Sequence, residues 1–120
     1  MSTKLSSRLP KPEMNGLNRL ARALARHPDR YRVLIAVVDC GSVSIDHTTA
    51  IDSLVATARI VAAEPVTERD QIDAVLDVMA ESHHERLINE ELDDRGAFQQ
   101  MAAEIRKAAL AELVADEGEL

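Results

Sequence analysis

Residues 31–39 read YRVLIAVVD, the most apolar run in the chain, and they decide the predicted fold. The run is short and rich in β-branched residues, which favours a strand over a helix. Apolar side chains fall on both faces of that strand, with Val33, Ile35 and Val37 on one face and Leu34, Ala36 and Val38 on the other. Both faces therefore need cover. We expect this run to be the central strand, shielded by helices or by a second copy of the chain.

Length and composition indicate one globular domain with a weak core. A chain of 120 residues fits one domain, and 46% hydrophobic with 29% charged residues is typical of a folded protein. Tyr31 and Phe98 are the only aromatic residues, so aliphatic side chains and many alanines must fill the core. Because small side chains stabilise a core less, we expect a marginal monomer that gains from self-association.

The single cysteine, Cys40, rules out a disulfide within the chain and is typical of a reducing compartment. We interpret it as a small core residue. The N-terminal segment is polar and does not resemble a signal peptide, and no apolar run reaches the roughly 18 to 20 residues that span a bilayer. We therefore expect a cytoplasmic protein with no membrane partner.

Charge is divided unevenly along the chain. Residues 1–32 hold eight basic residues against two acids, a net charge of +6. Residues 33–120 hold six basic residues against nineteen acids, which gives −13 within the total of −7. This asymmetry is typical of surfaces that pair with each other or with oppositely charged partners.

The first half of the chain predicts a helix followed by a hairpin. Residues 1–12 are polar and basic, and we expect them to form a flexible arm. A helix is predicted from Glu13 to Arg26 or His27, because Pro28 disfavours helical geometry in the residue before it. The strand then continues past Gly41, which we interpret as a bulge, with a tight turn as the alternative. Residues 46–53 would form the hairpin tip and residues 54–63 the antiparallel return strand.

The second half predicts two helices. Thr67 is a candidate N-cap with Asp70 as its capping-box partner, and the helix that follows places Ile72, Val75, Leu76, Met79 and Ala80 on one face. We expect a loop from about His83, a last helix over residues 97–114 and an acidic tail over residues 116–120. The predicted architecture is a single α+β domain over residues 13–115, with a long antiparallel β-hairpin packed on helices and completed by them or by dimerisation.

The passages ALARHPDRYRVLIAV and VATARIVAAEPV resemble a group of small proteins of actinobacteria and their phages. Members share an Ala-rich and Leu-rich helix, a strand that follows a DRYRV-like sequence, a hairpin and an acidic helix. The resemblance covers roughly residues 17–80. It implies an α+β fold and a bacterial or phage setting, and it implies no catalytic residue. This chain departs from the group at the hairpin tip, where DHTTAIDS replaces a Gly-containing turn.

Two charged faces are the candidate interaction sites. The basic face consists of Arg19, Arg22 and Arg26 on the first helix, opposite its apolar stripe. The acidic stripe consists of Asp70, Asp73, Asp77 and Glu81, at spacings of three and four residues. The simplest interpretation of the stripe is a solvated helix face. The functional alternatives are a weak divalent-ion site and a mimic of the DNA backbone. No loop has an EF-hand arrangement, so we predict no metal and no cofactor.

His83 and His84 lie beside Glu81 and Glu85, but adjacent helical positions project about 100° apart and cannot both reach one ion. We expect His83 to cover the edge of the core and His84 to face water. Cys40 and His47 have opposite parity on a strand and do not form a nucleophile pair. Nothing supplies an oxyanion site or a phosphate cradle, so we predict that the protein is not an enzyme. A hydrolase that uses His84 with Glu81 or Glu85 is the third alternative, and it would require a cleft that converges on those side chains.

These patterns predict a non-enzymatic protein-interaction module that forms a homodimer, and the resemblance implies a phage or prophage accessory protein with a bacterial host protein as partner. The basic face and the acidic stripe would orient the partners through opposite potentials. The alternative is a nucleic-acid-binding regulator that grips phosphates with the arm and the first helix. The near absence of aromatic residues argues against stacking on single strands.

Overall fold

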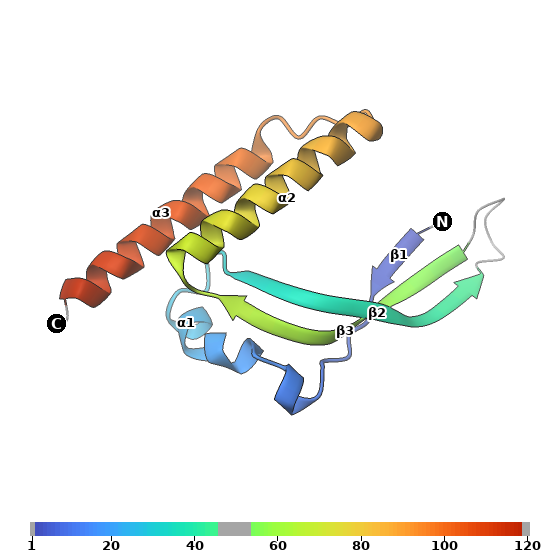
Figure 1. Ribbon diagram of the computed structural model, residues 1–120, viewed down its shortest axis with the longest axis horizontal. Helices are drawn as coiled ribbons and strands as arrows, with labels where there is room; N and C mark the ends of the chain where they lie inside the picture. The colour runs from blue at the N-terminus through green and yellow to red at the C-terminus, as the bar shows by residue number, and fades with distance from the viewer. Residues whose placement is uncertain (1, 46–53, 119–120) are drawn as a thin grey trace. The chain divides into compact units, whose positions relative to one another are not determined.

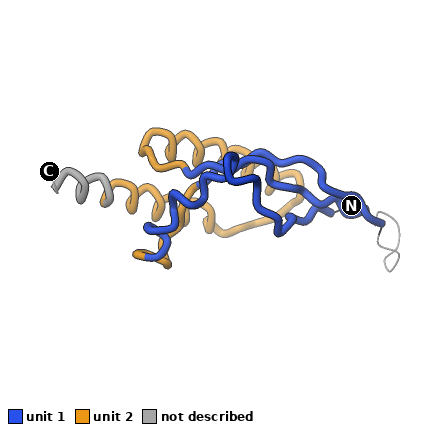
Figure 2. The backbone as a smooth tube through the Cα atoms, turned by 90° about the horizontal axis from the view of Figure 1, so that it is seen from below, with its two compact units in different colours: residues 1–25, 34–65 blue, residues 26–33, 66–120 orange. Residues whose placement is uncertain are grey.

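A computed structural model describes residues 2–45 and 54–118 of the chain, with side chains as far as residue 111. The chain divides into two units, residues 1–25 with 34–65 and residues 26–33 with 66–120 (Figure 2). The first unit holds the sheet and the N-terminal segment, and the second holds two long helices (Figure 1). The predicted α+β class is confirmed.

The sheet has three strands among the described residues, β1 (Ser2–Leu5), β2 (Val33–Ile45) and β3 (Leu54–Val66), in the order β1-β3-β2. β2 and β3 run side by side in opposite directions, as predicted for the hairpin (Figure 1). The prediction of β2 as the central strand is wrong, because β1 adds to the far side of β3 and leaves β2 at an edge.

β1 comes from the segment that we expected to be a flexible arm. It pairs with β3 in parallel, from Ser2 opposite Val55 to Leu5 opposite Ala58. Its sequence, STKL, is too short and too polar to show a strand pattern. Pairing with β3, and not intrinsic propensity, therefore defines this strand.

The predicted first helix is interrupted. Short 3-10 turns at Pro12–Met14 and Leu17–Leu20 precede α1, which covers only Ala21–Arg26 and ends where Pro28 predicts. The interruption lies at Asn15 and Gly16. The Gly16 amide donates to the Ala63 carbonyl of β3 at 2.7 Å, and a Cβ at Gly16 would collide with the Glu64 carboxylate. A side chain at this position would displace the Glu64 carboxylate, and the bond to Ala63 withdraws one amide from helical bonding.

β2 passes through Gly41 as one continuous strand, so the tight turn considered there does not form. β3 continues three residues beyond the predicted end and includes Pro65. The predicted hairpin tip, residues 46–53, lies outside the described residues.

The second unit is built on α2 (Arg69–Asn89) and α3 (Ala97–Gly118). α2 does not end near His83 but continues six residues further, to Asn89. The N-cap is Glu68 and not Thr67, and no side chain closes the first turn. None of the described helices combines the length and hydrophobicity needed to cross a bilayer.

The core of the second unit joins the two helices to the strand residues nearest to them. Its buried members are Val33, Val66, Ile72, Leu76, Phe98, Ala102 and Ile105, and Val75, Ala80, Met101 and Ala109 pack against them. Leu76 is the most deeply buried, at 1% exposure. The predicted apolar face of α2 is thus confirmed, except that Met79 is 43% exposed.

Candidate interaction site

The outer edge of β2 is unpaired within the described sheet. β2 is 13 residues long and contains no lysine and no proline, and its one charged residue is Asp39. β1, at the opposite edge, is four residues long and carries Lys4. Short length and lysine are the usual protection of an edge strand against pairing with another chain. β2 lacks this protection, and β1 has it.

Apolar side chains of β2 are exposed on both faces. Four lie on one face by strand alternation, which we call the odd face: Ile35, Val37, Val43 and Ile45, exposed by 52%, 61%, 62% and 58%. Leu34 and Val38 are exposed on the other face. From Leu34 onward every residue of β2 is exposed. Within the first unit, the described residues therefore do not supply the cover that the sequence predicts for this strand.

The charge on β2 is neutralised by the neighbouring strand. Arg59 of β3 donates from Nε to Oδ1 of Asp39 at 2.9 Å and from Nη2 to Oδ2 at 2.6 Å. The hydrogen bond from Arg59 lowers the pKa of Asp39, and the positive charge adds to this effect. The edge strand thus carries no uncompensated charge at neutral pH.

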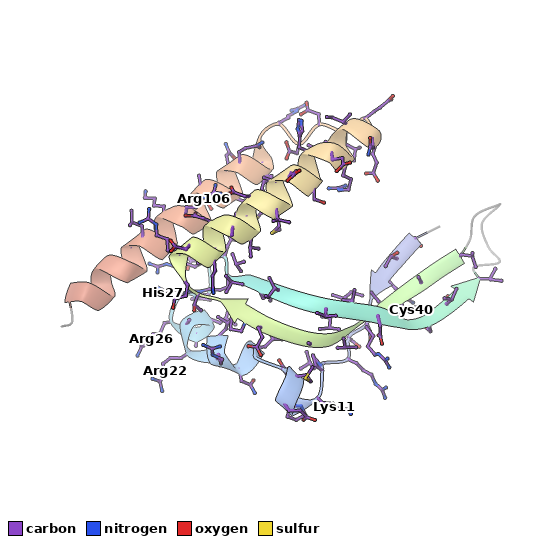
Figure 3. The ribbon with its side chains drawn as sticks, viewed as in Figure 1. Lys11, Arg22, Arg26, His27, Cys40 and Arg106 are labelled. Atoms are coloured by element: carbon purple, nitrogen blue, oxygen red, sulfur yellow. The ribbon has the colours of Figure 1, made fainter. Side chains whose placement is uncertain are left out.

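Within the described part of the chain, one of the three arginines of the basic face has an ion-pair partner. Arg19 lies in the second 3-10 turn, 3.8 Å from the Glu64 carboxylate, and Arg22 and Arg26 are exposed on α1 (Figure 3). Arg22 has no ion-pair partner among the residues that the structure describes. The same holds for three other cations of the first unit, Lys4, Arg8 and Lys11.

An open pocket of about 550 Å³ lies between the N-terminal segment and β3. The segment leaves β3 after the Ser6 amide donates to the Ala58 carbonyl, and it returns where Gly16 meets Ala63. The lining residues are Arg8, Leu9, Pro10, Lys11, Met14, Arg59, Ile60 and Val61. The pocket therefore combines an apolar floor with cations, a surface suited to an anionic group.

Half of the acidic stripe is engaged within its own unit. Arg106 of α3 donates from Nε to Asp73 and from Nη2 to Asp77 of α2, each at 3.0 Å. Asp70, Asp77 and Glu81 are exposed. Arg106 thus joins the two helices and reduces the negative potential of the stripe. No group of three metal-ligating side chains occurs among the described residues.

His83 lies at the edge of the core, as predicted. Its ring stacks on Phe98 at a centroid distance of 4.9 Å, and Nε2 donates to Oδ2 of Asp94 at 2.5 Å. Arg86 Nη2 lies 3.4 Å from Nδ1. Both ring nitrogens are therefore occupied by structural partners. His84, Glu81 and Glu85 are exposed on α2.

Asp94 has a structural role that the sequence pattern does not reveal. Oδ1 accepts from the Gly96 amide at 3.0 Å, and Oδ2 accepts from the Phe98 amide at 3.3 Å, which caps the start of α3. The hydrogen bond from His83 is the main cause of the lowered pKa of Asp94, and these amides add to it. An Asp a few residues before a predicted helix was the available signal.

Cys40 is exposed on β2, and its interpretation as a small core residue is wrong (Figure 3). Every residue of β2 after Val33 is exposed, because the described residues of the first unit cover neither face of this strand. His47 lies outside the described residues.

The fold and these surfaces define a small α+β protein with an unprotected edge strand. Comparisons of the chain with protein-family models, with curated proteins and with solved structures found no match.

Proposed function

We propose that this chain is a small non-enzymatic protein-interaction module that forms a homodimer by edge-to-edge pairing of β2. The outer edge of β2 carries the proposal, because it is long, has no protecting lysine or proline and exposes apolar side chains on both faces. Such an edge presents a row of backbone donors and acceptors to another strand. Pairing with its own copy gives most of the exposed side chains a cross-strand neighbour and forms a closed two-fold assembly.

The charged faces have a different part in this proposal. Asp73 and Asp77 already form ion pairs with Arg106, so the net negative charge of the acidic stripe is smaller than its sequence suggests. We assign to the basic face and the acidic stripe the orientation and approach of a further protein partner, through potentials that raise the rate of encounter.

The setting of the module rests on the sequence. A single cysteine supports a cytoplasmic location, since an exposed thiol such as Cys40 stays reduced there. The resemblance of residues 17–80 to small proteins of actinobacteria and their phages supports an accessory role for a phage or prophage, with a bacterial host protein as partner. Capture from an actinobacterial lysate with the wild type, compared with capture by a variant reversed at Arg22 and Arg26, tests this role.

The dimer is tested with two matched substitutions. Val37→Lys places a charge on the β2 edge, and Val78→Lys changes the same residue type on α2, where the side chain is 67% exposed. In sedimentation velocity we expect Val37→Lys to be monomeric and Val78→Lys to remain dimeric, with both variants folded by circular dichroism. Equal masses for the two variants would place the dimer contact away from β2.

Nucleic-acid binding is the second candidate function. It is favoured by Lys4, Arg8, Lys11 and Arg22, which have no ion-pair partner within the described part of the first unit. Cations of this kind contribute affinity for phosphates without reading sequence. The net charge of −7 opposes it.

A titration with fluorescent duplex DNA separates the two functions. Deleting the arm would also remove β1, so the sharper variant is Arg8→Glu/Lys11→Glu, which leaves Ser2–Leu5 in place. We expect the wild type and this variant to bind equally weakly at physiological salt. Wild-type binding that falls steeply with salt and is lost in the variant would favour the nucleic-acid function.

A further inference from the structure

We infer the register of the dimer: the two copies of β2 pair antiparallel with Cys40 opposite Cys40 on the two-fold axis. This inference rests on the proposed homodimer and adds the alignment of the two strands. In an antiparallel pair related by a two-fold axis normal to the sheet, one residue faces its own copy and all other pairs follow from it. Each possible register is therefore defined by the one residue that lies on the two-fold axis.

The register with the greatest overlap is disfavoured, because it brings the carboxylates of two Asp39–Arg59 ion pairs directly against each other. The middle residue of Val33–Ile45 is Asp39, so full overlap places Asp39 opposite its own copy. Like charges directly opposite each other are destabilising in a sheet. Centring the pair on Cys40 places Asp39 opposite Gly41 of the second copy, which leaves room for its salt bridge with Arg59.

Apolar matching selects the same register. With Cys40 at the centre, the odd-face pairs are Ile35 with Ile45, Val37 with Val43 and Asp39 with Gly41. All four exposed apolar residues of the odd face then meet another branched apolar residue, the kind of pair that stabilises sheets. Centring on Val38 would instead place Ile35 opposite Gly41 and Val37 opposite the Asp39 carboxylate. A second copy thus fits this edge better than a charged partner would.

The contact is short, which favours a weak dimer. The paired segment is residues 35–45 of each copy. This is about half of the roughly 20 to 30 residues per side in a standard interface, so we expect a dissociation constant of about 1 to 100 µM. The experiments below therefore use protein at about 200 µM.

Cysteine cross-linking measures the register. Facing residues of an antiparallel pair have Cα atoms about 4.5 to 5.5 Å apart, within reach of a disulfide. In wild type, diamide should oxidise two Cys40 thiols to one disulfide, while diamide takes up the two protons and two electrons and becomes a hydrazine. In Cys40→Ser/Ser42→Cys the two thiols lie four residues apart along the strands, about 13 Å, and should not cross-link.

Each result decides the inference. Cross-linking of wild type and not of the shifted cysteine supports it. Equal cross-linking of both, or cross-linking of the shifted cysteine alone, overturns the register, while light scattering on the same samples still reports whether a dimer exists. A monomeric wild type at this concentration overturns both the register and the proposed homodimer.

A charge-pair exchange tests the register without thiol chemistry. Val37→Lys/Val43→Lys places two lysines opposite each other in this register, and Val37→Lys/Val43→Glu places lysine opposite glutamate. We expect the first variant to be monomeric and the second to recover at least tenfold in dimer affinity. Identical behaviour of the two variants would contradict the pairing of positions 37 and 43.

Discussion

Arg59 of β3 donates hydrogen bonds to both carboxylate oxygens of Asp39 on β2, with nitrogen–oxygen distances of 2.9 and 2.6 Å. This salt bridge neutralises the only charged residue of β2, a strand whose outer edge has no lysine or proline to protect it. The relationship connects the local chemistry of the sheet to self-association, because an uncompensated carboxylate is a standard obstacle to pairing of edges.

Replacing Arg59 should therefore weaken the dimer. In Arg59→Gln the Asp39 carboxylate keeps its charge and loses its partner, so we expect a lower dimer fraction that rises again with added salt, which screens the repulsion between the two copies. The double variant Asp39→Asn/Arg59→Gln removes both charges and should regain the wild-type dimer. Sedimentation equilibrium at two salt concentrations measures this, and a dimer unaffected by Arg59→Gln would argue against neutralisation.

Asp94 should make the second unit sensitive to acid. Its pKa is lowered in the folded state from the ordinary value of 3.8, so the ionised carboxylate stabilises the fold at pH values above 3.8. That contribution is lost as the pH falls through the lower folded-state pKa. We expect the melting temperature of wild type to decrease when the pH is lowered below about 4.

The matched variant for Asp94 is Asp94→Asn, which keeps the size of the side chain and removes its charge. We expect a lower melting temperature at neutral pH, because the bond to His83 and the cap of α3 are weakened. Its melting temperature should also change less than that of wild type between pH 6 and 3, as followed by circular dichroism. The same acid dependence in both proteins would assign it to other carboxylates.

Arg106 should contribute modestly to stability. It joins α3 to Asp73 and Asp77 of α2, but the arginine side chain is 41% exposed, so solvent screens both pairs. We expect Arg106→Ala to lower the free energy of unfolding by about 0.5 to 1 kcal/mol and Arg106→Lys to recover only part of it, because lysine lacks the planar fork. Lys107→Ala, a change at an exposed neighbour, is the control in urea titration. Equal effects at positions 106 and 107 would show that the bridge contributes nothing.

Leu76 should be the residue of the second unit that tolerates truncation least. Its side chain is 1% exposed, so Leu76→Ala leaves a cavity and should lower the free energy of unfolding by about 2 to 5 kcal/mol. Val78→Ala, two residues along α2 at 67% exposure, should change it by less than about 0.5 kcal/mol. Chemical denaturation of both variants makes the comparison. A small loss for Leu76→Ala would mean that the core is not centred on this residue.

The local pattern of the sequence predicted the main elements well. The hairpin, the two C-terminal helices and the buried faces of Ile72 and Leu76 follow from periodicity, which is a local property of the chain. The stop of α1 before Pro28 follows from proline sterics in the same way.

Non-local pairings could not be predicted. β1 forms because Ser2–Leu5 meets β3 more than fifty residues later, and Gly16 interrupts the first helix because its amide meets Ala63. The strand order β1-β3-β2 leaves β2 at an edge, and Cys40 is exposed because the described residues of the first unit do not cover its face of β2. The sequence therefore predicted charged helix faces as the candidate site. It could not predict the edge strand, because strand order cannot be derived from the periodicity of apolar residues.

The most direct test of the account is the mass of the wild-type chain in solution. Static light scattering from about 5 to 200 µM should show the mass rising from 13.2 kDa toward twice that value, as a two-fold β2 contact requires. A constant mass of 13.2 kDa over this range would contradict the pairing of β2 with its own copy.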